Sequence, residues 1–158
     1  MKAKIIGICT ILLGMTLSSC EDGSNFPDEP YLEYRSYRLV DANVDTALPA
    51  DHAVIELYFT DGDGDVGIEP IPVGDFNFFA DVFERADSGG YQYAYGWPGI
   101  LKDLADQGQQ NKALEGIIYY KVALSEVAGD TAIIEFELID DAGNSSGIVK
   151  SDKLYLDF

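Results

Sequence analysis

The stretch AVIELYFT at residues 53–60 decides the fold class of this chain. Every second position carries a side chain suited to a core, namely Ala53, Ile55, Leu57 and Phe59. A two-residue period of this kind is typical of a β-strand with one face against a core, because successive side chains of a strand point to opposite faces. The stretch therefore predicts a half-buried strand.

Further extended segments lie on both sides of this strand. β-branched and aromatic residues between turn formers predict strands at 31–40, 76–84, 116–125, 131–139 and 147–158. The only helical pattern is about two turns long, at 98–107. The interval 85–115 is too long for one loop and is expected to contain an additional hairpin or helical turn. Short strands without alternating helices predict one all-β domain at 31–158, an antiparallel β-sandwich of immunoglobulin-like character.

The charge of the chain restricts its partners. It has 28 acidic and 10 basic residues and a formal net charge of −18, while 47% of its residues are hydrophobic, enough for a packed core. Such an anionic surface repels phosphate backbones, so we expect no nucleic-acid partner. Cations are favoured ligands.

The first 19 residues are typical of a cleaved bacterial signal. Lys2 and Lys4 precede a mostly apolar run at 5–17, which is too short to span a bilayer. The run ends in Leu17-Ser18-Ser19-Cys20, which looks like a lipobox, so residues 1–19 are predicted to be a lipoprotein signal peptide and Cys20 the lipidation site. Acyl chains on Cys20 would anchor the protein to a membrane without a transmembrane helix.

Residues 20–30 are mostly polar and contain two prolines, which predicts a flexible tether. Their acidic stretch resembles the surface-export signal of Bacteroidetes lipoproteins. The resemblance implies an outer-membrane lipoprotein displayed at the cell surface, with the periplasmic face as the alternative.

The loop that follows the predicted strand at 53–60 offers oxygen ligands for a metal ion. Asp61, Asp63 and Asp65 alternate with glycines that let the backbone curl around a small ligand. Hard cations such as Ca²⁺ prefer such carboxylate sets. The stretch is not an EF-hand, because Val66 stands where that motif requires glycine and Pro72 where it requires glutamate.

A second acidic turn contains Asp140, Asp141 and Asn144. In an immunoglobulin-like order this turn and the 61–65 loop lie at the same end of the sandwich. The two loops are therefore predicted to meet and to supply a calcium site together. The alternative is a pair of solvated turns, because Asp and Gly are also the residues that tight turns require.

The segments VIELYFTDGDGDVGI (54–68) and IIEFELIDDAGNSSGIV (133–149) resemble parts of uncharacterised Bacteroidetes lipoproteins with an immunoglobulin-like or fibronectin-like domain. The resemblance extends over most of residues 54–157. It implies the fold and a surface location, and it transfers no catalytic residues.

An alternating aromatic stretch suggests a second kind of ligand. If residues 91–97 were fully extended, they would present four rings on one face as a platform for sugars, namely Tyr91, Tyr93, Tyr95 and Trp97. Packing of the same rings over a sheet is the alternative.

No pattern in the chain indicates catalysis. It has no nucleophile elbow, phosphate loop or dinucleotide fingerprint, and its single histidine, His52, is expected at the surface. The prediction is a membrane-anchored, non-enzymatic binding or structural module with a protein or glycan partner, and calcium as its candidate cofactor. The alternative is a glycan-binding accessory lipoprotein that uses the aromatic platform.

Overall fold

The computed structural model describes residues 26–43, 50–67, 75–102 and 112–157. These residues form eight β-strands and no helix. The strands are β1 (Tyr31–Val40), β2 (His52–Asp61), β3 (Phe78–Arg85), β4 (Tyr91–Gly96), β5 (Leu114–Ala123), β6 (Thr131–Leu138), β7 (Val149–Lys150) and β8 (Leu154–Tyr155). No helix that could cross a membrane occurs among the described residues.

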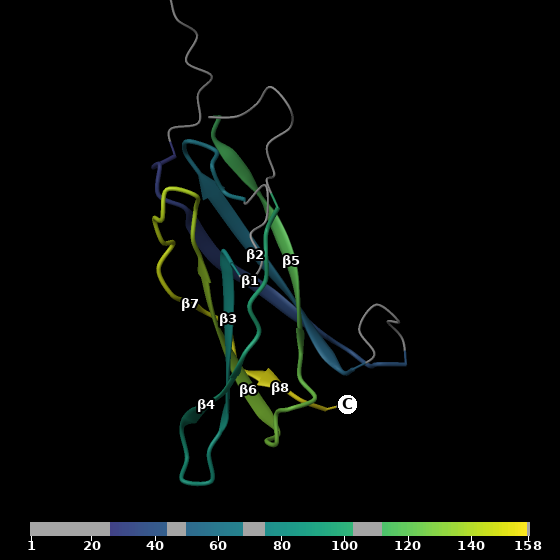
Figure 1. The fold of residues 1–158 in the computed structure, drawn as a ribbon. Helices are drawn as coiled ribbons and strands as arrows, with labels where there is room; N and C mark the ends of the chain where they lie inside the picture. Colours follow the sequence, from purple (N-terminus) through teal and green to yellow (C-terminus); the bar gives the residue numbers. More distant parts are fainter. Residues whose placement is uncertain (1–25, 44–49, 68–74, 103–111, 158) are drawn as a thin grey trace, which may run out of the picture.

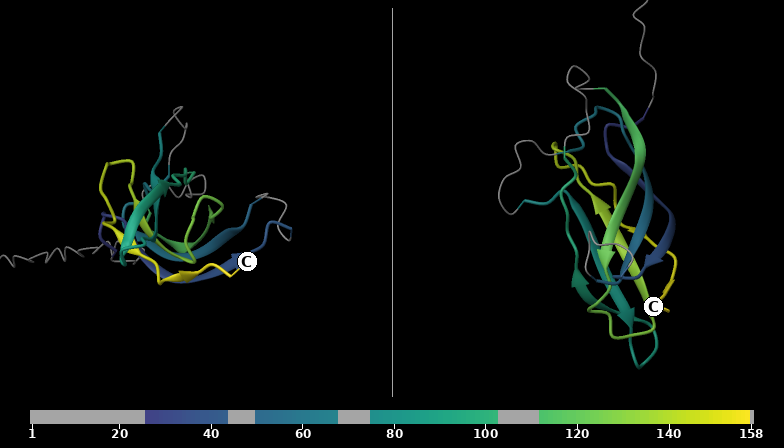
Figure 2. Two further views of the ribbon diagram at one scale, coloured as in Figure 1. Left: turned by 90° about the horizontal axis from the view of Figure 1, so that it is seen from below. Right: turned by 90° about the vertical axis from the view of Figure 1, so that its right-hand side faces the viewer.

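The strands form two antiparallel sheets that lie face to face (Figures 1 and 2). One sheet has the order β1-β2-β5, and the other has the order β4-β3-β6-β7, with β8 also paired to β6. The first, second and fifth strands thus form one sheet, and the third, fourth, sixth and seventh form the other. The predicted all-β sandwich is confirmed.

The core lies between the two sheets. Ala53, Ile55, Leu57 and Phe59 of β2 are all buried, as the alternation predicts. They pack with residues of the opposite sheet in one cluster that includes Phe78, Val82, Ile134, Phe136 and Leu138. Each fully buried side chain of this size contributes roughly 1.5–3 kcal/mol to the free energy of unfolding.

The interval 85–115, expected to contain an additional hairpin or helical turn, contains one additional strand, β4, which pairs back with β3 through a turn at 86–90. The helix predicted at 98–107 is absent from its described part, residues 98–102, and 103–107 lie outside the described residues. Gly99 instead forms a β-bridge with Phe78. The Asn77 side chain holds Leu101 extended by donating to its carbonyl and accepting from its amide (3.0 and 2.7 Å).

The last predicted strand, 147–158, is reduced to the two short strands β7 and β8. Between them, the hydroxyl of Ser151 accepts a hydrogen bond from the amide of Ile134 (2.9 Å). A side-chain oxygen thus takes the place of a main-chain carbonyl. This substitution lets the main chain leave the regular ladder between β7 and β8.

The two ends of the sandwich differ. One end carries the start of the described chain at Phe26, the loop after β2 and the turn after β6; the β3–β4 hairpin lies at the other end (Figure 1). We call the first end the acidic pole, because residues 61–65 and 140–141 belong to it.

Candidate metal centre

Asp61 is the last residue of β2, and its side chain is fully buried. Its Oδ2 atom accepts a hydrogen bond from the amide of Val66 (3.2 Å). Its Oδ1 atom is also buried and has no hydrogen-bond partner. A buried carboxylate oxygen without a donor is costly, because nothing replaces the water it has lost.

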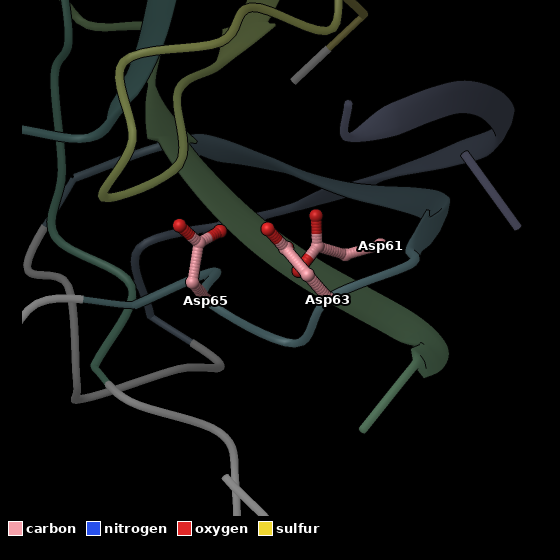
Figure 3. Close-up of side chains that lie close together, drawn as sticks. All are labelled: Asp61, Asp63 and Asp65. Atoms are coloured by element: carbon pink, nitrogen blue, oxygen red, sulfur yellow. The ribbon is translucent and has the colours of Figure 1, made fainter. Parts of the chain in front are cut away.

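Asp63 and Asp65 bring two more such oxygens to the same place. One carboxylate oxygen from each of the three aspartates lies within 4.8 Å of the others. The Oδ1 atoms of Asp63 and Asp65 are buried and lack a hydrogen-bond partner, like that of Asp61. Figure 3 shows the three side chains side by side along the loop that leaves β2.

Glycines allow the loop to curl this tightly. Gly64 has a φ of +76°, a conformation that costs other residues 1–2 kcal/mol or so. A Cβ atom at Gly64 would lie 2.0 Å from the carbonyl oxygen of Lys112, so the backbone also packs directly against the chain that enters β5. Glycine at position 64 is therefore required by packing as well as by backbone conformation.

The two acidic loops meet, as the topology predicts. Asp65 accepts a hydrogen bond from the amide of Ala142 through Oδ2 (3.0 Å), and its carbonyl accepts one from the amide of Asp141 (3.3 Å). The first of these bonds joins residues 77 positions apart in the sequence. Together the two bonds fix the turn after β6 against the loop after β2.

The predicted ligands of the second loop do not join the cluster. Both carboxylate oxygens of Asp140 accept hydrogen bonds from Asn144, one from its amide and one from its side chain (2.7 and 2.8 Å). Asp141 is exposed. Of the six residues predicted to bind metal, the structure brings Asp61, Asp63 and Asp65 together. Asp140 and Asn144 are hydrogen-bonded to each other within their own turn.

The electrostatics of the site favour a bound cation. Burial, followed by the negative charges of Asp140, Asp63 and Asp61, raises the pKa of Asp65 to about 6. Burial also raises the pKa of Asp61, and Asp63 and Asp140 add to this effect. A divalent cation would reverse both effects by stabilising the ionised carboxylates.

The donor set fits a hard cation. Three carboxylate oxygens within 4.8 Å of one another, without histidine or cysteine among the clustered residues, are oxygen ligands of the kind that Ca²⁺ prefers. Two of the three carboxylates use their second oxygen to hold loop amides. The same carboxylates could therefore bind an ion with one oxygen and hold the loop with the other.

The four rings of the predicted platform do not share one face. Val82 of β3 pairs with Tyr95 of β4, and the next residue, Phe83, pairs with Tyr93. Ala94 therefore has no partner on β3 and forms a β-bulge. Tyr93 therefore faces outward with Phe83, with ring centroids 5.8 Å apart, while Tyr95 faces inward with Val82.

Tyr91 pairs with exposed Arg85 on the outer side, whereas Trp97 packs against the core with Tyr95. The prediction of a single four-ring surface is therefore wrong.

The inward rings close one side of the sandwich. The Tyr95 hydroxyl donates to the carbonyl of Ala123, and the Trp97 indole nitrogen donates to that of Lys121 (3.0 Å). Tyr120 donates back to the Trp97 carbonyl (2.9 Å). The Tyr95 and Trp97 side chains thus bind main-chain carbonyls of β5, which is the last strand of its sheet among the described residues.

His52 is fully buried, so the prediction of a surface histidine is wrong. It begins β2 one residue earlier than predicted and pairs with Val40 on one side and Ala123 on the other. Its Nδ1 atom lies 2.9 Å from the carbonyl oxygen of Ala50. The residue belongs to the folded core of the sheet.

The signal peptide at 1–19 and the lipidation site Cys20 lie outside the described residues. No protein-family model, curated protein or solved structure matches this chain.

Proposed function

We propose that this chain is a membrane-anchored, extracytoplasmic, non-catalytic module whose β-sandwich is stabilised by calcium at Asp61, Asp63 and Asp65. The anchor is Cys20, and the location is the outer membrane, at the cell surface. The signal at 1–19 and the lipobox support this address. The proposed role is to hold a binding surface outside the cell.

The observation that carries the calcium site is the set of three buried, unpartnered Oδ1 atoms. An acidic turn in solvent would hydrate its carboxylates, whereas Asp61 is fully buried. Two unit charges 4 Å apart repel by about 4 kcal/mol at an effective dielectric of 20. Calcium would replace this repulsion by attraction to the three carboxylates. We assign the ion a structural role because the loop that would hold it is hydrogen-bonded to the turn between β6 and β7.

The test is thermal unfolding of the full chain, purified from membranes in detergent, in chelator and in 1 mM Ca²⁺. A ligand at 100 times its Kd stabilises the folded state by about 2.7 kcal/mol, so we expect the melting temperature to rise by about 10 °C. Asp63→Asn is expected to abolish the rise. Asp87→Asn, in the hairpin at the other end, is the matched control and should retain it.

An unchanged melting temperature in calcium would refute the metal site. Intact-mass measurement of the same material reports whether Cys20 carries acyl chains, so the anchor and the ion are tested independently.

A second candidate function is glycan binding, at a different place from the predicted platform. Tyr119 is 66% exposed on the outer face of the β1-β2-β5 sheet. It borders a hollow of about 80 Å³. The other lining residues are Ser36, Tyr37, Arg38, Val54 and Glu56. An exposed ring beside hydrogen-bonding side chains is the arrangement that sugar recognition requires.

For this candidate, we expect the protein to bind one or more ligands on a glycan array, and Tyr119→Ala to lose at least tenfold in affinity. The control is Tyr93→Ala, which removes a ring that is 58% exposed on the other sheet. Equal binding by the Tyr119→Ala variant, or no binding by the wild type, would contradict the assignment.

A further inference from the structure

The chain that enters the domain passes directly over the candidate metal loop. A Cβ atom at Gly62 would lie 2.4 Å from the carbonyl oxygens of both Phe26 and Pro27. The main chain of residues 26–27 therefore packs on the main chain of the metal loop, at the residue between Asp61 and Asp63. Only glycine permits so close an approach.

The contact extends the pairing of the first two strands. Tyr31 pairs with Thr60, the residue before Asp61, and Pro30 is buried. Residues 26–30 thus continue away from β1 beside the loop that continues away from β2. The position of this N-terminal segment, defined here as residues 26–30, depends on the path of that loop.

The path of the loop depends in turn on its charge. The compact form holds Asp61, Asp63 and Asp65 with their unpartnered oxygens together, and Asp140 adds a further negative charge nearby. Repulsion between these groups opposes the compact form unless a cation is bound. A loop that expands would displace the carbonyl groups of Phe26 and Pro27, which have no free space beside Gly62.

We propose that a divalent cation at Asp61, Asp63 and Asp65 fastens the N-terminal segment to the domain and so sets how rigidly the sandwich is joined to the chain that precedes it. This inference rests on the proposed calcium site. With calcium, the segment is held along the acidic pole. Without it, the segment detaches while the two sheets, which share no residue with the cluster except Asp61, remain folded.

The experiment is hydrogen–deuterium exchange on the full chain, purified in detergent, in 1 mM Ca²⁺ and in chelator. We expect calcium to slow exchange at least tenfold in peptides that cover 26–33 and 61–67, because both lose local opening. Peptides from β3 and β6 report the sheets and should change little. Asp63→Asn should remove the calcium effect from both regions.

The Gly62→Ala variant tests whether the N-terminal segment can be released while the metal loop still binds calcium. Gly62 lies outside the left-handed region of φ, so alanine is allowed there, but its methyl group would push away the carbonyls of Phe26 and Pro27. We expect this variant to keep calcium protection at 61–67 and to lose it at 26–33. Gly129→Ala is the control, since its Cβ would have no neighbour nearer than 3.6 Å.

The outcomes distinguish the two proposals. Calcium protection of 61–67 without protection of 26–33 in the wild type would overturn the coupling and leave the metal site intact. No protection in either region would overturn both. The wild-type comparison decides the matter even if Gly62→Ala fails to fold.

Discussion

At the scale of single residues, Asp65 links the charge of the site to its architecture. Its Oδ2 atom accepts a hydrogen bond from the amide of Ala142, and its Oδ1 atom is buried without a hydrogen-bond partner. Its pKa of about 6 arises from burial first and from neighbouring carboxylates second. The residue is therefore sensitive to both pH and cations near neutrality.

This gives a pH-dependent stability in the absence of metal. Because the pKa of Asp65 is raised in the folded state, that state binds the proton more tightly than the unfolded chain does. The stabilising contribution of the protonated group is complete below pH 4 or so and is lost as pH rises through about 6. We expect a loss of about 1 kcal/mol, because partial exposure of the side chain screens part of the shift.

The measurement is the melting temperature in chelator between pH 4 and pH 7.5, for wild type and Asp65→Asn. The wild type should lose a few degrees more than the variant over this range. With saturating calcium the wild type should lose this dependence, since the ion keeps the carboxylate ionised. A variant as pH-sensitive as the wild type would contradict the assignment to Asp65.

The residues of this site were predictable only in part from the sequence. The spacing of Asp61, Asp63 and Asp65 identifies the cluster, because alternate acids separated by glycine can curl toward one point. Asp140 was predicted as a ligand because the sandwich order places its acidic turn at the same end as the loop after β2. Its hydrogen bonds to Asn144 depend on the geometry of a tight turn, which the amino-acid spacing does not specify.

At the scale of secondary-structure elements, β4 and β5 determine how one side of the sandwich is closed. The side chains of Tyr95 and Trp97 donate to main-chain carbonyls of β5, the last strand of the described β1-β2-β5 sheet. Burial raises the pKa of the Tyr95 hydroxyl to about 12, so it remains a donor at physiological pH. Side-chain donors thus bind carbonyls of β5 in the way that the main chain of a neighbouring strand would.

Removing this donor should destabilise the fold. We expect Tyr95→Phe to lower the free energy of unfolding by about 1–2 kcal/mol, because the carbonyl of Ala123 loses its partner in a half-buried place. Urea denaturation measures the change. Tyr93→Phe, whose ring faces solvent, should stay within about 0.5 kcal/mol of the wild type. Equal effects of the two changes would argue against the edge contact.

The sequence predicts the positions of the strands better than it predicts the side of the sheet on which each side chain lies. Tyr31–Val40 is a strand with the predicted bounds, and β2 exceeds its prediction by one residue at each end. The face of each β4 ring could not be predicted, because the bulge at Ala94 arises from pairing with β3. A two-residue period holds only while the register is unbroken.

At the scale of the whole molecule, the sandwich order explains why distant loops share one end. The loops after β2 and β6 were expected to meet from topology alone, and the hydrogen bonds between Asp65 and residues 141–142 confirm it. The approach of residues 26–27 to Gly62 was not predicted, since a polar, proline-containing stretch reads as a tether. Its packing depends on space at one glycine.

The placement of Phe26 and the β3–β4 hairpin at opposite ends has a consequence for accessibility. If the proposed anchor holds the molecule by the chain that precedes Phe26, the aspartate loop lies at the anchored end and the β3–β4 hairpin at the far end of the sandwich. The turn at 86–90 then projects farthest outward. Beside it, a hollow of about 400 Å³ lies between the hairpin and residues 128–129. On a protein displayed at the cell surface as proposed, this tip would be the part most accessible to antibodies and proteases.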